Sequence, residues 1–218
     1  MEDGLRDLTV GVLGGTGPLG KGLARRWSGV GLRVVVGSRS AQRADAAAAE
    51  IGGSASGAEN IECARAADVL VVAVPWDGHA DLLKSVAEAT AGKVVVDVVN
   101  PLGFDKQGPF RLEVPEGSAA EQAQALLPQA RVLAAFHHVS AVLLNDPEVA
   151  EIPMDVLVLG EERDDTDLVR ALADAVPGMR GVYGGRLRNA GQVEALTANL
   201  IAVNRRYKTH AGIRVTGV

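Results

Sequence analysis

The residues most suited to chemistry near the start of this chain are glycines at a fixed spacing. Gly15, Gly17 and Gly20 give the pattern G-x-G-x-x-G between an apolar run and a segment that begins at Pro18. In a dinucleotide site such glycines allow a tight turn, a close approach of the pyrophosphate to the backbone, and close packing of a helix on a strand. A helix starting at Pro18 would direct unpaired N–H groups and its positive dipole end at that pyrophosphate. The spacing therefore predicts a dinucleotide-binding turn, with a purely structural turn as the alternative.

A second group follows the next apolar run. Ser38 and Arg39 come directly after it, and Arg43 lies one helical turn further on. NAD-specific proteins usually carry an acid here for the ribose hydroxyl, whereas a hydroxyl and two guanidiniums suit a 2′-phosphate. Two solvated arginines are the alternative, but cations at a helix N-terminus oppose the helix dipole unless an anion binds there. The pattern favours NADP.

The segment from Pro75 to His79 follows a strongly apolar, β-branched run. Ligands of doubly wound sheets bind outside the carboxyl ends of the strands, so this loop is expected to flank the cofactor. Trp76 either covers the dinucleotide or packs the loop, and both interpretations stay open. We expect His79 near a helix start that Asp77 caps.

Two adjacent histidines, His137 and His138, end another apolar run. Neighbouring side chains on an extended chain point to opposite faces, so this pair is a poor metal chelate, and we predict no metal site. Either one ring faces the cleft or both are structural and bonded to loop backbone.

The single cysteine, Cys63, excludes an internal disulfide and is expected to be a small, partly buried residue.

The elements that must position these groups follow from hydrophobic periodicity. We expect strands at 9–13, 32–36, 68–74, 93–99, 131–136, 155–160 and 181–183, a short strand near Asn60, and a loop from 103 to 117. Helices are expected at 18–28, 41–51, 118–127 (opened by a Ser118–Glu121 capping box), 161–176 and 189–207. The expected fold class is α/β: a doubly wound, Rossmann-type parallel sheet at 1–136, with a small C-terminal α/β lobe at 137–218.

Composition narrows the class of protein. The chain has 218 residues, 47% hydrophobic and 22% charged, which is typical of a soluble globular protein. A net charge of −5 argues against a general nucleic-acid binder. No run reaches the roughly 18 apolar residues of a membrane span, and the polar first residues do not resemble a signal peptide, so we expect a cytoplasmic protein. The basic stretch 205–208, with His210 and Arg214, is either a solvated face or a site for an anionic ligand or partner subunit.

A site for NADP without metal ligands points to hydride transfer, in which the cofactor carries the chemistry. Short-chain dehydrogenases need Tyr-x-x-x-Lys, and neither Tyr183 nor Tyr207 has a lysine four residues later. β-Hydroxyacid dehydrogenases and imine reductases usually need a long helical C-terminal domain, whereas the segment after 136 still contains expected strands. No general acid–base pair stands out, so we predict no catalytic side chain and a second substrate that is itself a hydride carrier.

At this point the chain resembles a known family, the NADPH-dependent reductases of the deazaflavin coenzyme F420. The motifs that carry the resemblance span nearly the whole chain: 14–24, 36–39, 74–76, 100–102, 118–121, His137 and 193–197. The glycine run alone is shared with the reductase domain of membrane ferric reductases, and the later motifs favour the coenzyme reductase.

The resemblance implies reversible hydride transfer between NADPH and coenzyme F420 by a homodimer. By this resemblance Thr16, Gly17, Pro18 and Leu19 would hold the pyrophosphate, and Ser38, Arg39 and Arg43 the 2′-phosphate. Val74, Pro75 and His79 would line the nicotinamide side. His137, Val139 and Ser140 would contact the deazaflavin, with Asn100 and Pro101 nearby. The alternatives are an NADPH-dependent flavin, ferric or imine reductase, and a non-catalytic NADP-binding sensor.

Overall fold

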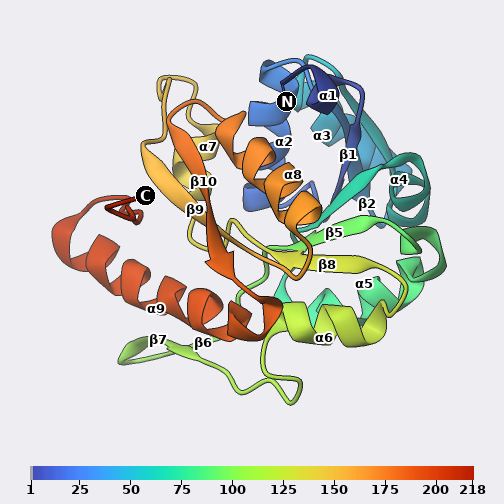
Figure 1. The fold of residues 1–218 in the computed structure, drawn as a ribbon. Coiled ribbons are helices and arrows are strands. Elements are labelled where there is room, and N and C mark those ends of the chain that lie inside the picture. Colours follow the sequence, from blue (N-terminus) through green and yellow to red (C-terminus); the bar gives the residue numbers. More distant parts are fainter. Residues whose placement is uncertain (1) are drawn as a thin grey trace.

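A sheet of eight strands forms the centre of the protein, in the order β10-β9-β8-β5-β4-β1-β2-β3 (Figure 1). The structure is a computed structural model that describes residues 2–218. The strands of this sheet are β1 (Thr9–Leu13), β2 (Arg33–Ser38), β3 (Ala55–Glu59), β4 (Val69–Val72), β5 (Val94–Asp97), β8 (Arg131–Ala134), β9 (Met154–Leu159) and β10 (Met179–Gly185). The helices are α1 (Glu2–Arg6), α2 (Pro18–Gly29), α3 (Ala41–Ile51), α4 (Asn60–Ala66), α5 (His79–Val86), α6 (Ala119–Leu126), α7 (Ala141–Asn145), α8 (Arg163–Asp174) and α9 (Ala190–Tyr207).

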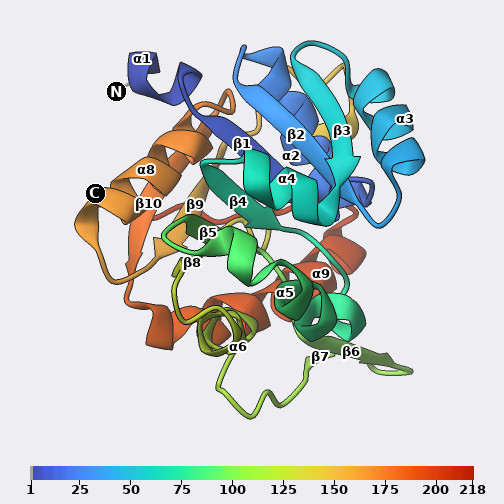
Figure 2. The same ribbon diagram turned by 90° about the vertical axis from the view of Figure 1, so that its right-hand side faces the viewer.

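Successive residues of the central strands face two separate cores, because side chains alternate across a strand. In β4, Val69 and Val71 belong to the core shared with α2, α3 and α8. Leu70 and Val72 belong to the core shared with α4, α5 and α6, and α4 and α5 lie in front of the sheet in Figure 2. A strand buried on both faces must be apolar throughout, which explains the continuous apolar runs of the sequence. The predicted α/β doubly wound fold is confirmed.

The sheet has one irregular joint, between β8 and β9. Every other neighbouring pair in it is parallel, whereas β8 and β9 are antiparallel and pair only through Ala134 and Leu159. β9 and β10 therefore run against the direction of the other six strands. They meet the rest of the sheet at the C-terminal end of β8.

A β-hairpin stands where the sequence predicts a loop. β6 (Leu102–Asp105) pairs with β7 (Gly108–Arg111) in a separate two-stranded sheet that projects beside α9 (Figure 1). Asp105 Oδ1 accepts hydrogen bonds from the N–H groups of Gln107 (2.7 Å) and Gly108 (3.1 Å), which closes the turn. The prediction was wrong because glycine and proline, which usually weaken strands, occupy this short hairpin.

The third strand also differs from the prediction. β3 covers Ala55–Glu59, and α4 begins at Asn60, where the strand was expected. A Cβ on Gly57 would lie 2.3 Å from the backbone nitrogen of Asp45, because α3 presses against this edge strand. The close approach of α3 requires a small residue there, and the small residues of β3 hide the strand from hydrophobic periodicity.

Candidate active site

The glycine turn connects β1 to α2 at the C-terminal edge of the sheet. A Cβ on Gly15 would lie 2.8 Å from the carbonyl oxygen of Val12 and 2.9 Å from Val36 Cγ1, and one on Gly20 would lie 3.0 Å from the carbonyl oxygen of Gly14. Gly17 is the N-cap residue of α2 and provides no side-chain cap, and Pro18 opens the helix. The first-turn N–H groups of α2 thus remain available to an external acceptor such as a phosphate. The structure brings Gly15, Thr16, Gly17, Pro18, Leu19 and Gly20 together as one turn.

Ser38, Arg39 and Arg43 gather beside that turn, at the end of β2 and the start of α3. Ser38 is buried, whereas both arginines are exposed and make no ion pair within residues 2–218. Ser40, the N-cap residue of α3, makes no capping hydrogen bond, and the first turn of α3 holds no acid. Uncompensated guanidiniums at a helix N-terminus form an electrostatic environment suited to an anion.

The loop after β4 rests on a buried ion pair. His79, the first residue of α5, is fully buried; its Nε2 lies 2.6 Å from Asp97 Oδ2 and its Nδ1 lies 3.0 Å from Gln122 Oε1. The side-chain nitrogen of Gln122 donates to Glu116 (3.3 Å), so the side-chain oxygen of Gln122 faces His79. Both ring nitrogens of His79 therefore donate, Nδ1 to Gln122 and Nε2 to Asp97. Burial has the largest single effect and lowers the pKa of His79, but the hydrogen bond and charge of Asp97, the Gln122 hydrogen bond and the charge of Glu194 together raise the pKa above its usual value.

Two consequences follow for this loop. Gly78 is the N-cap residue of α5 and no side chain caps the helix, so the predicted Asp77 cap is wrong. His79 lies beneath the loop rather than on its surface, and the Trp76 ring lies over it with ring centroids 5.4 Å apart. Val74 and Trp76 are half-buried and Pro75 is exposed at this edge of the sheet. The His79–Asp97 pair thus anchors the segment that bears these three residues.

The ends of β5 and β8 are joined through one backbone carbonyl. Asn100 Nδ2 donates to the carbonyl oxygen of His137 (2.7 Å), and Thr197 Oγ1 of α9 donates to the same oxygen (3.2 Å). Asp97 Oδ1 also accepts from the N–H group of Val99 (3.0 Å), which fixes the start of the Val99–Pro101 loop. Helix α9 and two strand ends therefore converge on the segment that begins at His137.

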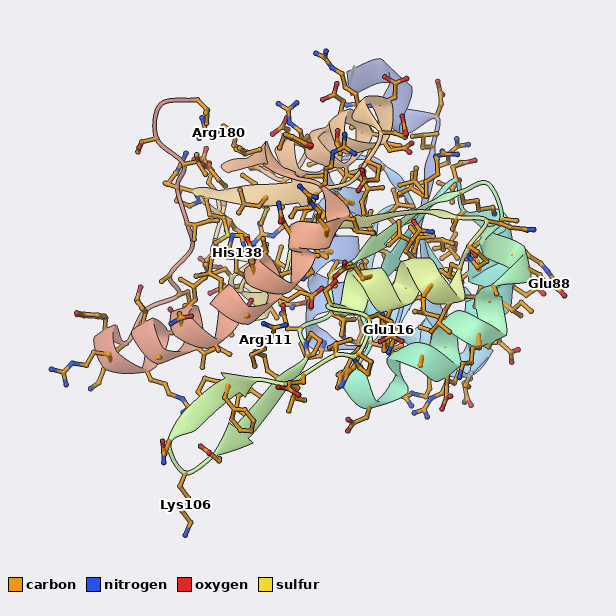
Figure 3. All side chains as sticks on the ribbon, turned by 60° about the horizontal axis from the view of Figure 1, so that its bottom comes forward. Glu88, Lys106, Arg111, Glu116, His138 and Arg180 are labelled. Atoms are coloured by element: carbon orange, nitrogen blue, oxygen red, sulfur yellow. The ribbon has the colours of Figure 1, made fainter. Side chains whose placement is uncertain are left out.

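The two histidines have different surroundings. His138, labelled in Figure 3, has a structural role. Its Nε2 lies 2.9 Å from the carbonyl oxygen of Asp155 in β9. Both ring nitrogens of His137 are buried and have no hydrogen-bond partner among residues 2–218. Burial lowers the pKa of His137 to about 4, so the ring is neutral at neutral pH. The Val98 and Val99 backbone and the charge of Asp97 favour the protonated ring, but they offset only part of the cost of its burial.

A buried carboxyl group, Glu194 of α9, lies behind this network. Its two oxygens accept hydrogen bonds from the N–H groups of Ala119 (3.0 Å) and Ala120 (3.2 Å), at the start of α6. Burial raises the pKa of Glu194 to about 7, against the lowering effect of these two N–H groups. Glu194 fixes α9 to α6 and so helps to hold Thr197 against the His137 carbonyl. The predicted helix start is confirmed, with Ser118 as its N-cap residue: Ser118 Oγ accepts from the N–H group of Glu121 (3.0 Å). The Glu121 carboxylate accepts from the Ser118 hydroxyl (2.9 Å), so the capping box is formed only in part.

Sequence reasoning missed the roles of Asp97, Gln122, Glu194 and Thr197. One available signal was the position of Asp97, an acid inside the run of valines from 94 to 99, because a buried charge needs a partner. Gln122 and Thr197 give no comparable signal, since their partners are distant in sequence.

The single cysteine, Cys63, is fully buried, and its Sγ lies 3.3 Å from the carbonyl oxygen of Val35. Burial raises the pKa of its thiol to about 12, so the thiol is inert.

Two surfaces meet at this edge of the sheet. One consists of backbone donors and guanidiniums from β1 and β2, and the other of the His137–Ser140 segment with Asn100 and Pro101. Within residues 2–218 no group of three or more His, Cys, Asp or Glu side chains is arranged to hold a metal ion. No helix in the same part of the chain is long and apolar enough to cross a membrane. The fold and this site are those of the Rossmann-type dinucleotide-binding class.

Comparison with known proteins narrows that class. Residues 9–101 match the family model described as NADP oxidoreductase coenzyme F420-dependent. The F420-dependent NADP reductase of Methanothermobacter thermautotrophicus is 37% identical over 97% of this chain and 96% of its own length, and that of Methanocaldococcus jannaschii is 32% identical over 97% and 99%. The chain belongs to the family of F420-dependent NADP reductases.

A solved structure agrees at the level of the fold. The crystal structure of a proposed F420-dependent NADP reductase from Arthrobacter sp. FB24 superimposes with a TM-score of 0.83 at 24% sequence identity. The alignment covers 96% of this chain and 99% of the other. The fold, including β9 and β10, is therefore shared over nearly the full length.

Proposed function

We propose that this protein catalyses reversible hydride transfer between NADPH and coenzyme F420. The observation that carries the proposal is the meeting of two unlike surfaces at one edge of the sheet. The β1–α2 turn with its guanidiniums suits a phosphorylated dinucleotide, and the His137 segment offers a second, separate polar contact. Membership of a family whose curated members are F420-dependent NADP reductases supports the same assignment.

The dinucleotide would lie across the first surface. Thr16, Gly17, Pro18 and Leu19 would hold the pyrophosphate, and Gly15 and Gly20 keep the turn close enough for it. Ser38, Arg39 and Arg43 would bind the 2′-phosphate, which explains a buried hydroxyl beside two unpaired guanidiniums.

The two redox rings would stack between the loop after β4 and the loop after β8. Val74, Pro75 and Trp76 would line the nicotinamide side, with His79 supporting them from below. His137, Val139 and Ser140 would contact the deazaflavin, with Asn100 and Pro101 beside it. Asn100 and Thr197 hold the His137 carbonyl oxygen and so fix the start of this segment.

The chemistry resides in the two coenzymes, which exchange a hydride directly. The protein's contribution is alignment, because transfer requires the donor and acceptor carbons at about 3–3.5 Å. The Asp97–His79 pair and the Asn100–His137–Thr197 contacts fix the two loops that would hold the rings. Catalysis would depend on the rigidity of these loops rather than on a side-chain acid or base.

Purified protein tests the proposal directly. NADPH oxidation coupled to loss of the visible absorbance band of F420 is the expected result. Turnover of riboflavin analogues, ferric chelates or imines without turnover of F420 would assign one of the alternative reductase activities. Tight NADPH binding without turnover of any acceptor would instead indicate a sensor.

We further propose a functional division at residue 136. Residues 1–136 would bind NADP, and residues 137–218 would complete the deazaflavin cleft. The single-pair connection between Ala134 and Leu159 supports this boundary. Limited proteolysis with and without NADPH tests it, since NADPH should protect sites before residue 136 more than those after it.

We also propose that the protein is a cytoplasmic homodimer. Phe104 (63% exposed) and Phe110 (45% exposed) place two aromatic rings on the surface of the hairpin, and exposed apolar clusters often mark interfaces. Phe104→Ser with Phe110→Ser should convert a dimer to a monomer in size-exclusion chromatography with light scattering. A wild-type monomer would contradict the dimer, and recovery in a membrane or secreted fraction would contradict the location.

A further inference from the structure

The C-terminal segment of the chain has an unusual charge. Residues 186–218 contain six arginines and lysines and one acid, Glu194, although the whole chain has a net charge of −5. Arg186 pairs with Glu161 (2.9 Å), and Arg214 lies 3.6 Å from Asp155. Arg205 and Lys208 make no ion pair within residues 2–218. Part of the positive charge at the end of α9 is therefore uncompensated.

The chain after α9 returns to the His137–Ser140 segment. After Tyr207 the chain turns back, because the N–H groups of Thr209 and Ala211 bond to the backbone and side-chain oxygens of Asn204 (3.3 and 2.6 Å). The turn brings His210 Nδ1 to 3.3 Å from Ser140 Oγ, so the tail meets the segment proposed to contact the deazaflavin. The far end of α9 and the nearby hairpin tip, marked by Lys106, project from the same side of the molecule in Figure 3.

The helix geometry separates the basic residues by face. At about 100° per residue, Asn204 falls within about 20° of Thr197, the α9 residue that contacts the His137 carbonyl. Arg205 lies about 80° from that direction and Arg206 about 180° from it. Arg205 is thus on a flank of the Thr197 side and lies next to the hairpin, since a Cβ on Gly108 would be 3.5 Å from its Nη1. Arg206 is on the opposite face of the same helix turn.

Lys208 occupies a backbone conformation that lysine does not favour. Its φ of 53° and ψ of 51° are left-handed, and a helix that ends in this way usually carries glycine at this position. A residue other than glycine lowers stability there. Lys208 stands two residues before His210, whose ring contacts Ser140, so the strained backbone lies in the turn that returns the chain to that segment.

We infer that Arg205, Lys208 and His210, called here the basic end of α9, bind the anionic tail of the deazaflavin coenzyme. The inference rests on the proposed function. Beyond its ring and ribityl chain, coenzyme F420 carries a phosphodiester and carboxylates, which are the groups that unpaired cations attract. The ring would lie against His137–Ser140, and the tail would leave the cleft past Ser140 toward the end of α9.

The inference is tested by comparing the steady-state kinetics of two electron acceptors. One is coenzyme F420, and the other is the same deazaflavin ending at its ribityl chain, which has the ring but no phosphate or carboxylates. Arg205→Ala with Lys208→Ala should raise KM for F420 by roughly three- to tenfold, as expected for exposed ion pairs. KM for the truncated acceptor, KM for NADPH and kcat should not change, and the difference should shrink at high salt. Arg205→Ala and Arg206→Ala each remove one charge, from different faces of the same helix turn, so Arg206→Ala is the matched control for the single variant Arg205→Ala.

Lys208→Gly removes the charge and the strain together. It should raise the melting temperature while raising KM for F420 and not for the truncated acceptor, a combination that misfolding cannot produce. Equal KM changes for both acceptors, no change for either, or the same change in Arg206→Ala would overturn the inference while leaving the proposed function intact. A wild-type protein that turns over neither acceptor would overturn both.

Discussion

The two sides of the candidate site are built in different ways. The half formed by β1, β2 and the turn after β1 relies on backbone: glycines that admit no Cβ, an uncapped helix start and a strand end. The half formed by β5, β8 and α9 relies on side chains that meet from distant parts of the sequence, such as Asp97 with His79 and Thr197 with the His137 carbonyl. Under the proposed function, NADPH would bind mainly to backbone groups, whereas F420 would bind to loops held by side-chain hydrogen bonds. The two sides should therefore respond differently to substitution.

The largest effect is expected in the side-chain half, from Asp97→Asn. Asparagine has one acceptor oxygen, so it cannot serve both the N–H group of Val99 and Nε2 of His79, and it carries no charge to balance the ring. Breaking a buried ion pair should lower the free energy of unfolding by about 3–5 kcal/mol. Urea denaturation measures the loss, and the exposed Asp81→Asn should stay within about 0.5 kcal/mol of wild type.

The next effect concerns the choice of dinucleotide. Arg39→Ala and Arg43→Ala should each weaken NADP binding by about 1.5–3 kcal/mol, since each removes a charged hydrogen bond to the 2′-phosphate. NAD lacks that phosphate, so its affinity should change little. Isothermal titration with both dinucleotides measures the difference, and equal losses for NADP and NAD would contradict the assignment.

Gly15→Ala tests the backbone half. Its Cβ would meet the carbonyl oxygen of Val12 at 2.8 Å and Val36 Cγ1 at 2.9 Å, so the turn must shift. We expect a loss of about 1–3 kcal/mol in unfolding free energy, together with weaker NADPH binding. Gly78→Ala is the control, because a Cβ there meets nothing within 4 Å. If both variants bind NADPH like wild type, the turn does not shape the site.

The last prediction concerns a change in the pH dependence of stability. The pKa of Glu194 is raised to about 7 in the folded protein against an ordinary value of 4.5. A raised pKa means that this group contributes stability below pH 4.5 that is lost as the pH rises through 7. Glu194→Gln should remove this component, so the stability difference between variant and wild type should vary with pH across that window. The exposed Glu113→Gln should give a constant difference, and a constant difference for Glu194→Gln would contradict the assigned burial.

The same contrast explains what the sequence could predict. The turn from Gly15 to Gly20, the strand at 9–13 and the helix at 41–51 follow from local rules of spacing and periodicity, and the structure confirms them. The His79–Asp97–Gln122 contacts join three elements, and no local pattern encodes which elements will meet. The hairpin at 102–111 escaped prediction for the opposite reason: glycine and proline, which locally favour a loop, are stabilised there by packing of β7 against α9.

The joint between Ala134 and Leu159 has a consequence for how such enzymes can diversify. Because one residue pair connects the two parts of the sheet, the chain has a natural breakpoint for recombination just after β8. An exchanged segment would have to keep the four hydrogen bonds that Arg26 of α2 donates to carbonyl oxygens between residues 143 and 149, because these bonds join the C-terminal segment to the helix of the glycine turn. A segment that kept those carbonyl positions would be free to change the acceptor side without displacing α2.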